Sequence, residues 1–148
     1  MKKLAAFLTL VLLITIKLNG QTIDDLKLSE NEIPAGYYLT DNNNCITFQA
    51  NMFYDNPKIF EGIIGKVKNK DVQNFDSEKD KGCIMYFEFE NDFLREDFIR
   101  GYVWGDKKPT KEHPEEFYSK GKFLIIFSFH KNSLIAEKSK EKIKKILE

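Results

Sequence analysis

The densest group of residues with catalytic or metal-binding chemistry is Lys111-Glu112-His113-Pro114-Glu115-Glu116, and His130 follows later in the chain. Imidazole and carboxylate groups are ligands for zinc and other divalent metals. A zinc-binding helix of the metalloprotease type needs two histidines four residues apart with a glutamate between them, and this spacing is absent. Acidic residues beside a proline are equally typical of the first turn of a helix, where the helix dipole favours negative charge. We therefore expect a structural helix start here and no metal or cofactor. The residues kept as weak catalytic candidates are His113, Glu115, Glu116 and His130.

The remaining polar residues form no established catalytic pattern. Ser128 and Ser133 flank His130, but the chain has no Gly-x-Ser-x-Gly nucleophile elbow. Glu88 and Glu90 would lie on one face of a strand, about 7 Å apart at the backbone. That spacing is within the range of glycosidase carboxylates, but alternating charged and apolar residues are more often the solvent-facing side of a strand. The sequence therefore favours a protein that is not an enzyme.

The segment from Gly101 to Pro114 combines glycines, prolines and the single tryptophan of the chain. Such a composition suits a fixed loop beside an aromatic surface, and loops of this kind often carry binding sites. A strand end followed by a rigid turn would explain the same residues. If the segment binds a partner, the expected contact residues are Tyr102, Trp104, Lys111 and His113.

The two cysteines, Cys45 and Cys83, each follow a polar, turn-like stretch and precede an isoleucine and an apolar run. In an oxidising compartment such a pair is a candidate disulfide. Two buried free thiols, which behave as small apolar side chains, are the alternative. We favour the disulfide. The chain has no Cys-x-x-Cys, which argues against a thioredoxin-like redox role.

The first twenty residues have the layout of a secretory signal peptide. Lys2 and Lys3 precede an apolar run over residues 4–16, and Gly20 supplies a small residue before a predicted cut at Gln21. The run is shorter than the roughly 20 residues that a membrane-spanning helix needs. Leu18 departs from the small residue expected at position −3, so the exact cut stays open. We expect an exported protein, periplasmic or secreted, with no stable membrane span after cleavage.

Charge and size limit the function classes further. The full chain has 23 basic and 23 acidic residues, and removal of residues 1–20 leaves a net charge of −3. A mildly acidic, mixed surface argues against nucleic-acid binding, which depends on neutralising phosphates. Residues 21–148 are enough for a single domain with its own core.

Apolar periodicity predicts an α+β domain with a mainly antiparallel sheet of about four strands and a C-terminal amphipathic helix. Strands are expected at residues 45–48, 83–90, 102–104 and 123–129, and helices at 113–118 and 133–148. Residues 59–67 fit either a helix after Asn56-Pro57 or a strand. Residues 68–81 are expected to form a mobile loop, with a short strand inside it as the alternative. The order allows a βαββαβ arrangement with an added C-terminal helix, or an antiparallel meander with its helices on one side.

These observations favour a non-enzymatic binding or accessory protein of the cell envelope, whose partner is an unidentified protein or envelope component. A small metal-dependent hydrolase using His113 and its neighbouring glutamates is the first alternative. An inhibitor of a secreted enzyme is the second.

Overall fold

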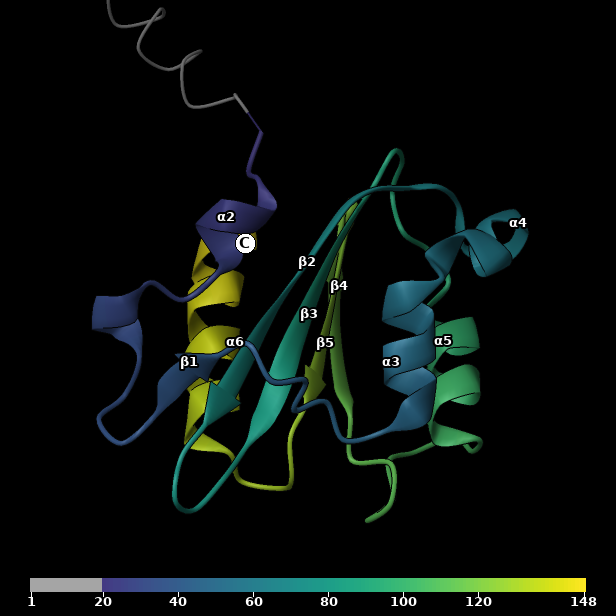
Figure 1. Cartoon of the computed structure of the whole chain (residues 1–148). Helices are drawn as coiled ribbons and strands as arrows, with labels where there is room; N and C mark the ends of the chain where they lie inside the picture. Colours follow the sequence, from purple (N-terminus) through teal and green to yellow (C-terminus); the bar gives the residue numbers. More distant parts are fainter. Residues whose placement is uncertain (1–19) are drawn as a thin grey trace, which may run out of the picture.

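The computed structural model describes residues 20–148, so the predicted signal peptide lies outside the described residues except for Gly20. Five antiparallel strands form one sheet in the order β1-β2-β3-β5-β4 (Figure 1). The strands are β1 (Tyr38–Thr40), β2 (Val67–Asp76), β3 (Gly82–Phe89), β4 (Glu116–Lys120) and β5 (Phe123–Ser128). The expected α+β class and antiparallel sheet are confirmed, with five strands rather than about four.

Helices cover both faces of this sheet, with α2 and α6 on one face and α3 and α5 on the other (Figure 1). Apart from the short η2 and α4 between α3 and β2, the chain order from β1 to β4 is βαββαβ, and β5 and the predicted C-terminal helix then follow. The arrangement with helices on one side only is therefore wrong. The helices are α2 (Ile23–Leu26), α3 (Phe48–Asp55), α4 (Glu61–Ile64), α5 (Glu96–Trp104) and α6 (Leu134–Leu147), with 3-10 turns η1 (Glu30–Glu32) and η2 (Pro57–Phe60).

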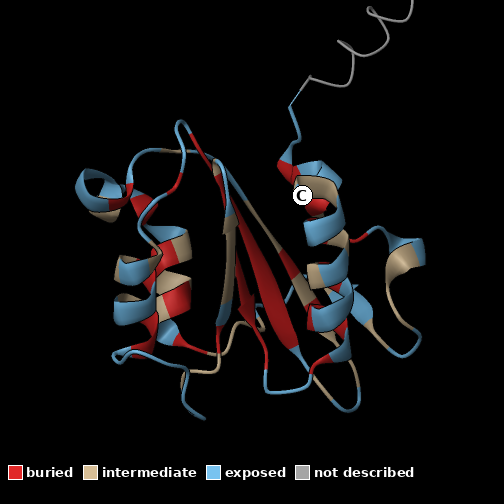
Figure 2. Cartoon of the chain, turned by 180° about the vertical axis from the view of Figure 1, so that it is seen from behind, coloured by how far each residue is buried: buried red, intermediate tan, exposed pale blue. Residues whose placement is uncertain are grey.

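The core consists of two apolar layers separated by the sheet. Along β3, Ile84 and Tyr86 face α6, whereas Met85 and Phe87 face α3 and α5. Every residue of β3 and of β5 is buried, as the central strands in Figure 2 show. Strands covered on both faces need apolar residues at consecutive positions, which explains why the sequence identified these two strands correctly.

Two predictions for the N-terminal half are wrong. Residues 45–47 form a loop rather than a strand, and Thr47 is the N-cap of α3, where its hydroxyl accepts a hydrogen bond from the Ala50 N–H. Residues 68–76 belong to the ten-residue strand β2, so the segment 68–81 is mostly strand and not a mobile loop with at most a short strand inside it. Only residues Asn74, Phe75 and Asp76 of β2 pair with β1. Within the described residues, the rest of β2 has no strand on its outer side, and this exposed edge accounts for its polar sequence.

Residues 59–67, which fitted either a helix or a strand, contain both: the segment is helical as far as Ile64, and strand β2 begins at Val67. Pro57 opens the turn η2, α4 continues to Ile64, and Gly65 then adopts a φ of 88°. A positive φ of this kind suits glycine, and the helix ends here. Strand β2 begins directly afterwards at Val67.

Two predictions for the C-terminal half are also wrong. Residues 102–104 belong to helix α5, whose buried Ile99 and Val103 are four residues apart and whose C-cap is Gly105 with a φ of 65°. Residues 113–118 are not helical, because they lead into and begin strand β4. There Phe117 and Tyr118 face opposite sides of the sheet, so the segment follows the period of a strand.

The N-terminal segment is attached to α6 by an ion pair. The Lys142 ammonium lies 2.7 Å from Glu32 and also donates a hydrogen bond to the Lys27 carbonyl oxygen. Hydrogen bonds from Lys142 and from the hydroxyl and N–H of Ser29 hold the pKa of Glu32 at about 2, below its usual value.

The Glu32 pKa predicts a loss of stability in acid. The stabilisation is fully present above about pH 4.5, the ordinary value, and disappears as the pH falls towards 2. Chemical unfolding between these pH values should show Glu32→Gln losing less stability on acidification than the unmodified chain. Equal slopes for the two proteins would contradict the prediction.

Among residues 20–148, no helix has the length and apolar composition that crossing a lipid bilayer requires.

Candidate binding site

A cleft with a volume of about 1040 Å³ lies where three segments meet at one end of the sheet. Residues 35–38 enter β1, residues 77–80 connect β2 to β3, and residues 130–134 connect β5 to α6. We call this the Asp80 cleft. Two of its three walls are the turns that adjoin the buried strands β3 and β5, so these walls rest on the core of the fold.

The β2–β3 turn is closed by its own side chains. The Ser77 hydroxyl donates to the Asp80 carbonyl oxygen at 2.7 Å and accepts from the Asp80 N–H at 2.9 Å. Side-chain hydrogen bonds of this kind are the usual reason that serine and aspartate occupy turns. They fix the backbone of Asp80, from which its carboxylate extends.

The Asp80 carboxylate connects all three segments of the cleft. Its Oδ2 accepts hydrogen bonds from the Tyr37 hydroxyl at 3.2 Å and from the Ser133 hydroxyl at 2.5 Å. Ser133 is also the N-cap of α6, so Asp80 lies at the positive end of the helix dipole. Burial raises the pKa of Tyr37, and the charge of Asp80 raises it further. Tyr37 therefore remains a neutral hydrogen-bond donor across the physiological range.

Two large apolar side chains are exposed on the cleft. Tyr38 and Leu134 are each 58% exposed, and His130 lies beside them. The nearby charges balance, with Glu78 and Asp80 against two lysines, Lys79 and Lys131. A ligand that combines apolar groups with hydrogen-bonding groups and carries little net charge fits this lining.

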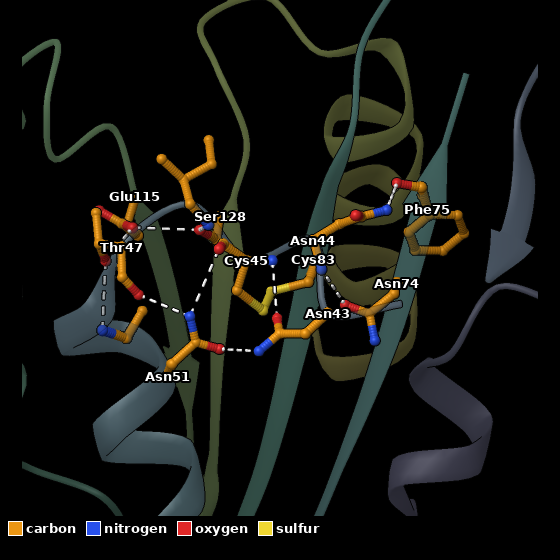
Figure 3. The surroundings of a disulfide bond; sticks show 12 residues. Asn43, Asn44, Cys45, Thr47, Asn51, Asn74, Phe75, Cys83, Glu115 and Ser128 are labelled. Atoms are coloured by element: carbon orange, nitrogen blue, oxygen red, sulfur yellow. Dashed lines mark hydrogen bonds between the residues drawn. A yellow bond between two sulfur atoms is a disulfide. The ribbon is translucent and has the colours of Figure 1, made fainter. Parts of the chain in front are cut away.

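The predicted Cys45–Cys83 disulfide is confirmed, with 4.9 Å between the two Cα atoms. Figure 3 shows the polar side chains around it. The Cys45 N–H donates to the Asn43 side chain, and the Asn44 side chain donates to the Phe75 carbonyl oxygen. The bond thus attaches the loop before α3 to the second residue of β3.

A fully buried carboxylate, Glu115, reinforces the same region (Figure 3). Its Oε1 accepts hydrogen bonds from the Thr47 hydroxyl at 2.6 Å and from the Ser128 hydroxyl at 3.2 Å. The Ser128 hydroxyl in turn accepts from the Ile46 N–H at 2.8 Å. Glu115 therefore connects the loop before α3 to β5, and its role in these contacts is structural.

Replacing Glu115 by alanine is expected to reduce the free energy of unfolding by about 2 kcal/mol, because two buried hydroxyls lose their acceptor. Glu115→Gln should cost less than Glu115→Ala, since an amide oxygen accepts the same two bonds, although its NH2 group replaces Oε2, which has no partner within residues 20–148. Urea unfolding of both variants tests this. Equal losses would show that the charge of Glu115, rather than its hydrogen bonding, stabilises the fold.

The four predicted catalytic candidates lie in different surroundings. Glu115 is buried beside Thr47, and the half-buried His113 has an Nδ1 atom that is buried without a partner in the described part of the chain. Glu116 pairs with Lys140 of α6 at 2.5 Å, on the face of the sheet that α6 covers. His130 lies on the Asp80 cleft. Residues 20–148 contain no group of three or more histidine, cysteine or acidic side chains able to hold a metal ion.

The predicted contact residues are divided between core and surface. Trp104 is buried and its indole N–H donates to the Glu115 carbonyl oxygen at 2.9 Å. Tyr102 is half-buried, with its ring 4.8 Å from that of Phe60. Lys111 is exposed and His113 is half-buried. Their part in binding stays a prediction.

Sequence reasoning did not identify the residues of the Asp80 cleft other than His130. The available signals were the chain break at residues 34–36 directly before Tyr37 and Tyr38, and the polar turn that contains Asp80. Each signal marks a turn, but only the pairing of β1 with β2 brings the two turns together.

The fold and the cleft define a disulfide-bonded α+β domain with helices on both sheet faces and a cleft at the end of the sheet. Comparisons with protein-family models, with curated proteins and with solved structures gave no match to this chain.

Proposed function

We propose that this chain is an exported, non-enzymatic binding domain of the cell envelope, and that its ligand occupies the Asp80 cleft. The observation that carries this proposal is the combination of exposed Tyr38 and Leu134 with the fixed carboxylate of Asp80 in a cleft of about 1040 Å³. That volume suits a small molecule or a short peptide segment of a partner protein.

Two further features support export. The first is the signal-like pattern over residues 1–20. The second is the disulfide, because such bonds persist mainly in oxidising compartments.

Fragment screening by NMR tests the binding proposal. Fragments that combine an aromatic ring with an amide should shift the backbone amides of residues 37–38, 77–80 and 130–134. Leu134→Ala should weaken these fragments several-fold, because it removes an exposed apolar wall of the cleft. Leu94→Ala is the matched control, since Leu94 is 82% exposed but does not line the cleft. Fragments that bind elsewhere, or equally well to both variants, would overturn the proposal.

The export proposal has its own test. Mass spectrometry of unreduced protein from the exporting cell should give a mass for residues 21–148 or a cut within a few residues, with the disulfide intact. An uncleaved chain found in the cytoplasm with two free thiols would overturn export without affecting the binding proposal.

A further inference from the structure

Strand β4 is an edge of the sheet, on the side opposite to β1 (Figure 1). It pairs with β5 in an uninterrupted register from Glu116 to Lys120. In the part of the chain that the structure describes, no strand lies on its outer side. An edge strand of this kind presents free N–H and C=O groups that another strand can pair with.

The side chains of β4 are divided regularly between the two faces of the sheet. Glu116 and Tyr118 lie on the α6 face, where Glu116 contacts Lys140 and Tyr118 packs against the core. Phe117 and Ser119 lie on the α5 face, with the Phe117 ring 5.1 Å from the Trp104 ring and the Ser119 hydroxyl donating to Glu96. By strand periodicity, Lys120 shares the face of Glu116.

The sequence of β4 is complementary to itself in the antiparallel direction. When two copies pair about Tyr118, Glu116 of each copy faces Lys120 of the other on one sheet face. On the other face, Phe117 lies opposite Ser119. A single two-fold axis therefore produces two opposite-charge cross-strand pairs, which is the form that a closed symmetric dimer takes. We infer that β4 is the contact by which a second copy of this chain extends the sheet.

The opposite edge of the sheet lacks these properties, because β1 has only three residues and the part of β2 that β1 leaves uncovered is irregular. The register of β2 shifts between Val67 and Asn69, and a bulge of this kind discourages pairing. The Asp71 carboxylate already accepts the Val72 N–H at 2.8 Å. Lys68 and Lys70 add like charges along the same segment. The β2 edge is thus protected against a second strand, whereas the β4 edge is not.

The inferred dimer is independent of the proposed ligand site. The Asp80 cleft is formed by β1 and by turns that contain no residue of β4. Failure of one proposal therefore leaves the other intact.

Sedimentation analysis over a range of concentrations tests the dimer, using unreduced protein from cells that express the full chain. The unmodified protein should associate reversibly to a dimer. Lys120→Glu should raise the dissociation constant about tenfold or more, because two attractive pairs become repulsive. The matched control is Lys108→Glu, which makes the same charge change in an exposed loop and should associate normally.

A mixing experiment separates the contact from any effect on folding. Glu116→Lys alone places two positive charges opposite each other in each cross-strand pair, and Lys120→Glu alone places two negative charges there, so each variant should associate weakly. An equimolar mixture of the two variants restores two opposite-charge pairs and should form heterodimers with a lower dissociation constant than either variant shows alone. A monomer throughout for the unmodified chain, or a mixture no stronger than its components, would overturn the inference.

Discussion

Removal of the Cys45–Cys83 disulfide is expected to lower the free energy of unfolding by about 4 kcal/mol. The two cysteines are 38 residues apart, and the intact bond restricts the unfolded chain over this whole loop. The loss is large for a domain of this size, because typical domains have only about 5–15 kcal/mol in total.

The variant that tests this prediction is Cys45→Ser combined with Cys83→Ala. Cys83 is fully buried and needs an apolar replacement, whereas the half-buried Cys45 tolerates a hydroxyl. Urea unfolding of the double variant should agree with that of the unmodified protein after reduction. A change below about 1 kcal/mol in both would show that the loop is already constrained in the unfolded state.

The location of the disulfide predicts which part of the molecule becomes less stable first when the bond is removed. Without the bond, the loop before α3 remains attached mainly by Asn44 and by the hydrogen bonds of Glu115 and Ser128. Hydrogen exchange should therefore increase most at residues 43–50, whereas the exchange of β3 and β5 should change less. A uniform increase over the whole domain would contradict this local effect.

The sequence correctly predicted those elements whose buried residues follow a regular pattern. Strands β3 and β5 are covered on both faces and read as apolar runs, and α6 has one apolar side and a clear N-cap at Ser133. The sequence did not predict strands β2 and β4, because an edge strand can remain polar along much of its length. It was also insufficient for α5, where Gly101 and the aromatic residues near it resemble a strand end although Ile99 and Val103 have helical spacing.

The candidate site, too, was only partly predictable from the sequence. The disulfide was predictable because two cysteines admit only one intramolecular pair. The Asp80 cleft was not predictable, because its residues come from three turns that only the sheet register brings together. Glu115 is a different case. Its position beside His113 suggested chemistry or a helix start, whereas a sequence cannot show that Thr47 and Ser128 direct their hydroxyls at one carboxylate.

Gly82→Ala is expected to destabilise the domain by about 3 kcal/mol. A Cβ atom at this position would lie well under 3.0 Å from the Ser128 carbonyl oxygen and from the Phe129 ring. The carbonyl belongs to the β5 backbone next to β3, so it cannot move aside without separating the two strands. Gly82 also precedes Cys83, and the substitution therefore strains the strand at the disulfide. Thermal and urea unfolding measure the loss.

Gly101→Ala is the matched control, because a Cβ at Gly101 has no neighbouring atom within 4 Å and the residue lies inside helix α5. Alanine there should stabilise the domain by up to about 1 kcal/mol. Opposite signs for the two substitutions would show that Gly82 is required by the close approach of β5, rather than by the flexibility of the chain. If Gly82→Ala were neutral, the end of β5 that leads to His130 would have to be deformable, and the walls of the Asp80 cleft could not be rigid.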